Sequence, residues 1–383
     1  MLGLIRQSFR WAVSLVGALS LLLTRYPETS RGSGAAYINL TKSPNQIGAA
    51  DIISLIVLAF LKYIPGYASR LRANGSSQTL VLPQIRAEGI LRIDQQAVET
   101  FKKSLRADGD SEESEVNPFF LVAQSVPLII YFLVNRACPI KPFGAVNTRN
   151  IIHVLQPASC RDAARLQQVS EEGRLTYISS IGGEGSPGRR RKRGVEFCIT
   201  IEIYAENELL MQQQCWFLQF LPASSEPRYR PEDELVKKIA AVPEDSLKAE
   251  FSLPMTLQDA LRWAATSKDY DGIHVSPLVA KLFGFQGALA HGNHVAALAV
   301  QQLQSTTTAS DTNAHEAAHN ASQKILWQSD GPFTIDISFV RPAMLPAILA
   351  VQWHCSKSDA SKAKLTVLRH GKVCIEGSCF INT

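Results

Sequence analysis

The stretch SKDYDGIHVSPLVAKLFGFQGALAHGNHVAALAVQQL (residues 267–303) holds an acid, two histidines and a glycine within otherwise apolar sequence. Asp269 precedes His274 by five residues, and His291-Gly292 comes directly before an apolar segment with helical spacing. A carboxylate and an imidazole on one loop can hold a water molecule and transfer its proton. The backbone N–H of a glycine at a helix N-terminus suits a developing oxyanion. This equipment suits addition of water to, or its removal from, an alkene conjugated to a thioester.

Two other site chemistries are less well supported by this stretch. Asp269, His274, His291 and His294 could ligate a metal ion, but their spacing matches no common zinc pattern. Nucleophilic catalysis lacks a G-x-S-x-G elbow or a catalytic cysteine context. We therefore predict acid–base chemistry, with no metal and no cofactor.

The pattern around the stretch predicts an α+β fold made of two similar halves. Apolar alternation and helical spacing predict the same order in each half: a strand, a helix, a long apolar helix and several antiparallel strands. In the first half the long helix is PFFLVAQSVPLIIYFLV (118–134), which is apolar all round and is therefore expected to be buried, with a kink at Pro127. Predicted strands lie at 79–83, 89–94, 150–157, 174–181 and 195–221 in the first half, and at 248–253, 333–340, 347–354, 364–370 and 373–381 in the second. The run at 195–221 is expected to form two strands around AEN (205–207).

Composition shifts divide the chain into a leader (1–67), a first half (68–222), a Pro-rich linker (223–247) and a second half (248–383). The leader has an apolar run from Trp11 to Leu23, flanking arginines and no acid before Glu28. It fits a signal or signal-anchor, a mitochondrial presequence or a membrane-surface helix. We expect a mitochondrial or membrane-associated protein that contacts the membrane through residues 1–67.

The overall composition excludes few classes of protein. The chain has 383 residues and a net charge of +5, too small an excess to indicate nucleic-acid binding. Seven cysteines are scattered without any C-x-x-C pair, which favours buried reduced thiols. The basic run RRRKR (189–193) lies in a Gly-rich segment and most simply forms a solvated hairpin loop, although it could meet the phosphates of coenzyme A or an acidic carrier protein.

Residues 267–294 resemble the hydratase motif of the MaoC-like, hotdog-fold enoyl-thioester hydratases and dehydratases. That motif reads approximately G-D-x-N-P-[IL]-H, then G-F-x-x-x-[IL]-A-H-G-M, and this chain reads KDYDGIH (268–274) and GFQGALAHGN (284–293). The segment SFVRPAMLP (338–346) is similar to a further strand and turn of the family. The first half looks like the degenerate first hotdog of double-hotdog members.

The resemblance implies a double hotdog, in which two antiparallel sheets each wrap around a long apolar helix. It implies Asp269 and His274 as the catalytic pair and the Gly292 amide as the oxyanion donor, with His291 and Asp271 as supporting residues. The implied substrate is a 3-hydroxyacyl or trans-2-enoyl thioester on coenzyme A or acyl-carrier protein, in fatty-acid metabolism. A homodimer is compatible with this family.

The chain departs from the motif at four positions, which now hold Lys268, Asp271, Gly272 and Asn293. Gly272 in place of proline predicts a looser turn, and Asp271 adds a negative charge beside Asp269. A non-catalytic acyl-thioester-binding or membrane-tethered scaffold is therefore a second hypothesis. A hotdog thioesterase is a third, opposed by the absence of Asp or Glu from the helix at 293–304.

Overall fold

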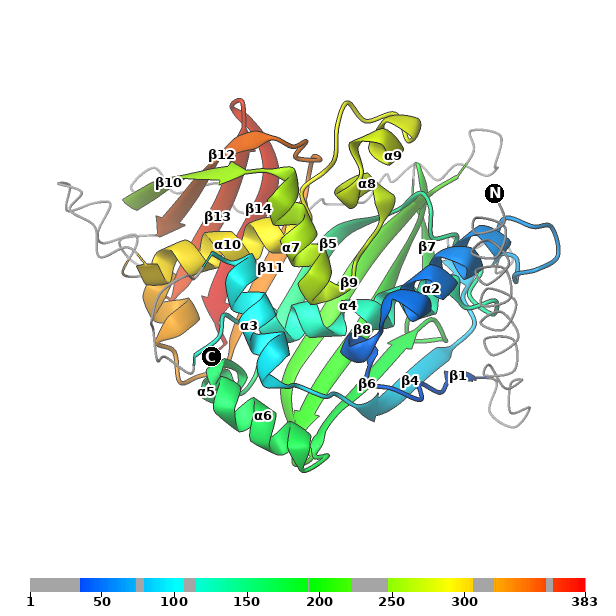
Figure 1. The fold of residues 1–383 in the computed structure, drawn as a ribbon, viewed down its shortest axis with the longest axis horizontal. Coiled ribbons are helices and arrows are strands. Elements are labelled where there is room, and N and C mark those ends of the chain that lie inside the picture. Colours follow the sequence, from blue (N-terminus) through cyan, green and yellow to red (C-terminus); the bar gives the residue numbers. More distant parts are fainter. Residues whose placement is uncertain are drawn as a thin grey trace, which may run out of the picture.

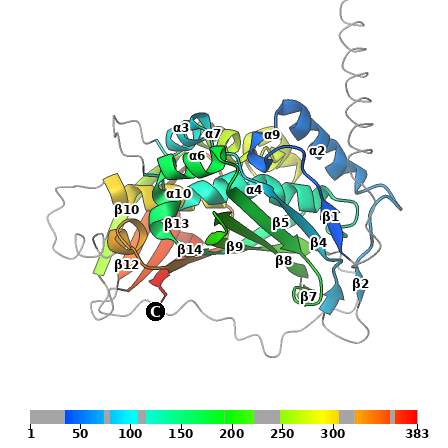
Figure 2. The ribbon, with the colours of Figure 1, turned by 90° about the horizontal axis from the view of Figure 1, so that it is seen from below.

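The computed structural model describes residues 35–73, 79–106, 115–191, 193–221, 247–305, 320, 322–355 and 361–382. One long sheet runs through this part of the chain, with the strand order β1-β4-β6-β8-β9-β5-β11-β14-β13-β12-β10. The helices lie against one side of the sheet (Figures 1 and 2). The predicted α+β double hotdog is confirmed, since each half supplies one end of the sheet and one long helix beneath it.

The first half contains the helix expected at its centre and most of the strands expected around it. The strand expected at 89–94 instead spans Ile85–Ile90. Helix α4 is buried over most of its length and contains Pro127 within it. Strands β8 and β9 form a hairpin whose turn holds Glu206 and Asn207 at positive φ, as the sequence AEN between two apolar runs predicts. The elements of this half are β1 (Ala36–Ile38), η1 (Pro44–Gln46), α2 (Ala49–Leu61), β2 (Arg72–Ala73), β3 (Thr79–Val81), β4 (Ile85–Ile90), α3 (Gln95–Ser104), α4 (Phe119–Val134), β5 (Ala145–Val154), α5 (Pro157–Arg161), α6 (Ala163–Glu171), β6 (Leu175–Ile181), β7 (Gly188–Arg191), β8 (Gly194–Ala205) and β9 (Glu208–Phe220).

The second half repeats the order of strand, helix, long helix and antiparallel strands. Its first helix, α7, begins at a capping box in which Thr256 and Asp259 satisfy each other's backbone N–H groups. The elements are β10 (Leu247–Met255), α7 (Leu257–Ser267), α8 (Gly272–Val275), α9 (Pro277–Leu282), α10 (Gly292–Ser305), β11 (Phe333–Phe339), β12 (Ala347–Cys355), β13 (Lys362–Arg369) and β14 (Lys372–Ile381).

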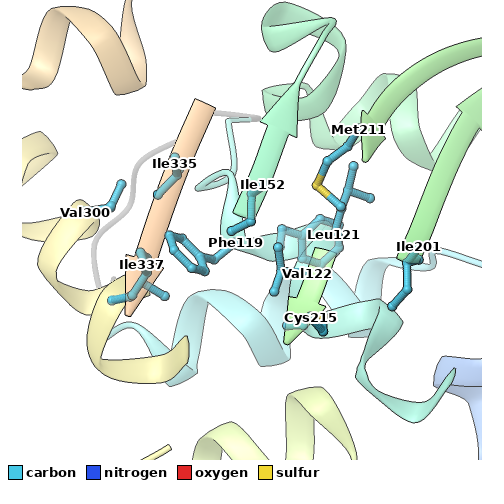
Figure 3. Close-up of a cluster of buried hydrophobic side chains, with 14 of the residues drawn as sticks. Phe119, Leu121, Val122, Ile152, Ile201, Met211, Cys215, Val300, Ile335 and Ile337 are labelled. Carbon is cyan, nitrogen blue, oxygen red and sulfur yellow. The ribbon is translucent and has the colours of Figure 1, made fainter. Parts of the chain in front are cut away.

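The two halves join edge to edge at the antiparallel pair β5–β11. On the face of the sheet away from the helices, Arg149 of β5 donates two hydrogen bonds to the Asp336 carboxylate of β11, at 2.7 and 2.5 Å. On the opposite face one apolar cluster continues across the seam, because α4 contacts β5 and β9 while α10 contacts β11 (Figure 3). The ladder and the shared core make the halves one folded unit.

Residues 36–61 differ from the expected leader, because they are part of the first half. Strand β1 pairs parallel with β4, and the buried Asn45 donates hydrogen bonds to Arg92 O and to the side chain of Gln124. Helix α2 packs against α4. These contacts use partners 40 or more residues away, which local sequence cannot reveal. The apolar run Trp11–Leu23 and the linker at 223–246 lie outside the described residues.

Two smaller features also differ from the prediction. Part of the expected basic loop is a strand, since β7 pairs with both β3 and β8. Helices α5 and α6 occupy the connection between β5 and β6, where no helix was predicted. The prediction for the cysteines is confirmed: all seven are buried free thiols, and burial raises the pKa of Cys160 and Cys198 to about 12.

Candidate active site

Asp269 is held at the end of α7 by its own loop. Lys268 adopts the left-handed conformation that ends this helix, and the Asp269 N–H donates to the Ser267 hydroxyl at 3.3 Å. The Asp269 carboxylate in turn accepts the Asp271 N–H at 3.2 Å. The acid is therefore fixed in a tight turn and only partly exposed.

Asp271 and Gly272 replace the motif's Asn-Pro but build an ordered turn. The Asp271 carboxylate accepts the Ile273 N–H at 3.2 Å and so caps the short helix α8. A side chain at Gly272 would place its Cβ 2.5 Å from Cγ1 of Val279, so α9 packs tightly against this position. Desolvation and the neighbouring Asp269 charge raise the pKa of Asp271, while His274 opposes the rise. The expected looseness is offset by a cap and a close contact.

His274 is orientated by a backbone carbonyl. Its Nδ1 lies 2.9 Å from Leu289 O. A carbonyl only accepts hydrogen bonds, so Nδ1 carries the proton and the neutral ring has its lone pair on Nε2. Leu289 is itself fixed by the hydrogen bond from its N–H to Ile273 O, at 2.9 Å. This arrangement leaves Nε2 as a base directed by the fold.

His291 is a buried neutral residue that supports both partners. Its ring stacks on that of His274, with centroids 3.9 Å apart, and its Nε2 donates to Asp269 O at 3.2 Å. Burial, together with the nearby His274 and His294, lowers the pKa of His291 well below its usual value. The approach of 3.8 Å between His291 Nε2 and the Asp269 carboxylate is therefore a dipolar contact and not an ion pair.

The structure brings three of the residues singled out in the sequence into one cluster. Donor atoms of Asp269, His274 and His291 lie within 4.8 Å of one another, a separation that one bridging water molecule, or one metal ion, can span. His294 lies outside this cluster, because its ring stacks on Trp263 and its Nε2 bonds to Ser104 O at 2.9 Å. Three of the four residues that the sequence offered as metal ligands therefore lie together.

Gly292 opens α10 beside this cluster. The first N–H groups of a helix have no partner within the helix and carry its partial positive charge. A Cβ on Gly292 would lie 2.4 Å from Cε1 of Phe339, so only glycine fits between α10 and β11. The Gly292 amide is thus available for a developing negative charge, with Phe339 closing the opposite side.

An amide chain from the first half reaches the same helix, and sequence reasoning missed it. The buried Asn150 of β5 donates to the Asn293 side chain at 2.7 Å and accepts from Asn147 at 3.0 Å. Asn293 is the departure from the motif's methionine, and Asn150 is a polar residue at the start of an apolar strand run. The unusual positions of Asn150 and Asn293 could have been noticed in the sequence. Only the joining of the two halves at β5 and β11 shows that these residues contact each other.

Part of this chain matches a known domain family. Residues 238–319 match the MaoC like domain. A curated relative, 3-hydroxyacyl-thioester dehydratase X of Mycobacterium tuberculosis, is 26% identical over 184 residues, which cover 48% of this chain and 57% of the relative. The alignment therefore spans little more than half of that relative's length.

Solved structures share the fold of more than three quarters of this chain. The crystal structure of HtdX from Mycobacterium tuberculosis superposes with a TM-score of 0.52 at 19% identity, over 78% of this chain and 99% of the other. A MaoC-like dehydratase from Phytophthora capsici gives a TM-score of 0.51 at 13% identity, over 79% and 96%. Identities this low establish the fold. The solved structures show that this chain has the double-hotdog fold, and its match to the MaoC like domain falls within residues 238–319.

Proposed function

We propose that the chain is a hydro-lyase that interconverts 3-hydroxyacyl and trans-2-enoyl thioesters of coenzyme A or acyl-carrier protein in fatty-acid metabolism. The observation that carries the proposal is the cluster of Asp269, His274 and His291 within 4.8 Å, with Nε2 of His274 left as the base. The named dehydratase relative supports the same reaction class.

In the hydration direction, a water molecule held between Asp269 and His274 attacks C3 of the enoyl thioester. Its proton passes to Nε2 of His274, and the Asp269 carboxylate stabilises the resulting imidazolium. The electron pair of the alkene moves onto the thioester oxygen, where the Gly292 N–H stabilises the enolate. The proton on His274 is then delivered to C2, which completes the addition of one water molecule. Dehydration is the reverse sequence.

The test is hydration of crotonyl-CoA by the full chain, followed as loss of the enoyl-thioester absorbance. Asp269→Asn and His274→Ala are each expected to lower kcat by at least about a hundredfold, the usual contribution of a general acid or base. His354→Ala on β12 is a matched control, because His354 is also partly buried but lies outside the cluster. Equal rates in wild type and both site variants would refute the assignment.

The same assay separates the alternatives. A non-catalytic acyl-thioester binder predicts binding of the substrate analogue without turnover. A metal-dependent site predicts loss of activity with a chelator and recovery with zinc, whereas the acid–base site predicts no effect. A thioesterase predicts release of free thiol, although α10 has no Asp or Glu to act as its acid.

We also propose that the N-terminal segment directs the chain to a mitochondrion or to a membrane. The support is its composition, with Arg6 and Arg10 before the apolar run Trp11–Leu23. A fusion of residues 1–34 to a fluorescent protein is expected to co-localise with a mitochondrial or membrane marker. A diffuse signal would exclude this role.

A further inference from the structure

Helix α2 is apolar on both of its faces, yet only one face is covered. Leu55, Leu58 and Ala59 pack against α4, whereas Ile53, Ile56 and Phe60 point outward, and Phe60 is 62% exposed. No charged residue occurs between Asp51 and Lys62. A helix that is hydrophobic all round is normally buried on all sides or in contact with lipid.

The outward face of α2 is held rigidly in that position. The buried Lys62 donates to three carbonyls at the end of α4 and just beyond it, those of Leu133 at 2.6 Å, Asn135 at 3.0 Å and Cys138 at 2.6 Å. The Tyr63 hydroxyl adds a hydrogen bond to Phe143 O. The exposed stripe is therefore a fixed feature of the fold.

Phe143 joins this stripe to a second exposed apolar element, α9. The Phe143 ring lies 4.8 Å from that of Phe60 and 6.1 Å from that of Phe283, measured between centroids. On α9, Leu278 is 71% and Leu282 80% exposed. Figure 2 shows α2 and α9 on the same side of the helical layer. We call the residues Ile53, Ile56, Phe60, Phe143, Leu278, Leu282 and Phe283 the α2–α9 surface.

The charges around the α2–α9 surface are mostly positive. Its three segments lie within residues 52–73, 116–161 and 272–305, which contain no Asp or Glu. The acids next to these segments include Asp51, which pairs with Lys42 at 3.4 Å, and Asp271. Exposed cations border it: Lys281 on α9, Arg136 after α4, and Lys141, whose Nζ lies 4.9 Å from the Tyr63 ring centroid. An apolar surface with a cationic rim is complementary to anionic headgroups over acyl chains.

The same charges argue against two other occupants. A second copy of the chain would bring the same excess of cations, those of Arg136, Lys141 and Lys281, against this one. The N-terminal segment, with Arg6, Arg10 and Arg25 and no acid before Glu28, carries the same sign. An anionic partner avoids both repulsions.

We propose that the α2–α9 surface docks on an anionic lipid bilayer. None of the helices in the described ranges is long and apolar enough to cross a bilayer, and α2 has 13 residues, about 20 Å, so it would lie in the membrane plane. Ser276 ends α8 and caps α9, so His274 lies three residues before Pro277, the first residue of the docked helix. Docking would thus set the candidate active site beside the lipid phase, where long acyl thioesters partition.

This inference deepens the proposed membrane association by naming a surface and a lipid charge, and it does not depend on the hydratase activity. The experiment is co-sedimentation of the full chain with phosphatidylcholine vesicles, with or without about 30% phosphatidylglycerol. Phe60→Asp and Leu282→Asp are each expected to lower partitioning into anionic vesicles roughly tenfold or more. Ile348→Asp is the matched control, because Ile348 is 72% exposed but lies on β12, away from the surface.

The proposal is supported if wild type and Ile348→Asp bind anionic vesicles more strongly than neutral ones and if salt weakens this binding. Both surface variants must also lose binding while keeping the wild-type Tm. The proposal is overturned if Phe60→Asp and Leu282→Asp bind like wild type while Leu15→Asp/Leu19→Asp abolishes binding, because the leader alone then makes the contact. Loss of a wild-type dimer in Leu282→Asp, without vesicle binding by wild type, would assign the surface to a second copy. Crotonyl-CoA hydration in free solution is measured separately. If the chain does not catalyse the proposed reaction, the vesicle measurement still tests membrane docking.

Discussion

Gly292 offers the sharpest test of the candidate oxyanion site, because its environment leaves no room for a methyl group. In Gly292→Ala the new Cβ would meet Cε1 and Cδ1 of Phe339 at 2.4 and 2.5 Å, about 1 Å inside ordinary contact. Either α10 or the Phe339 ring must move. Overpacking of this kind costs about 1–3 kcal/mol of unfolding free energy, and a displacement of about 1 Å at a reacting group lowers kcat by about a hundredfold.

The assay combines urea unfolding with crotonyl-CoA kinetics on Gly292→Ala, Phe339→Leu and the double variant. Phe339→Leu removes the ring atoms that the new methyl group meets, so the double variant should regain most of the stability lost in Gly292→Ala and part of the lost kcat. The coupling energy between the two sites should therefore be favourable. A Gly292→Ala protein with wild-type stability and wild-type kcat/KM would refute the reasoning, as would strictly additive effects.

Three further outcomes are expected from contacts near the site. Burial lowers the pKa of His294 from 6.5 to about 4. As the pH falls, the unfolded chain therefore binds a proton at this histidine before the folded chain does. Wild type should lose about 3 kcal/mol of unfolding free energy between pH 6.5 and 4 through this group. Urea titrations of His294→Gln should give a shallower pH dependence, and identical slopes would contradict the assignment. Asn150→Ala should cost about 1–3 kcal/mol by unpairing buried amides, with a smaller cost once Asn293→Ala is present; additive costs in a double-mutant cycle would argue against a shared chain. Gly272→Ala should cost about 1–3 kcal/mol, recovered in part by Val279→Ala; an unchanged urea midpoint for Gly272→Ala would show that α9 yields freely.

Much of the architecture was predictable because local patterns and burial agree. The two long apolar helices, the α+β class and most strands of both halves follow from apolar periodicity that the tertiary structure keeps. The same agreement holds at the AEN turn between β8 and β9 and for the seven buried cysteines. Predictions failed where an element depends on a distant partner: β1 pairs with β4, and β7 lies between β3 and β8.

The candidate site shows the same division. The local sequence brings Asp269, His274 and His291-Gly292 close together, because all four fall within 24 residues joined by short turns. Tertiary structure decided how these groups are orientated and what surrounds them. The Leu289 carbonyl selects the His274 tautomer, Phe339 forbids a side chain at Gly292, and Asn150 arrives from the other half to meet Asn293. These properties are set by atoms brought together across a sheet seam and a helix end, and distances of that kind are not written in any local stretch of sequence.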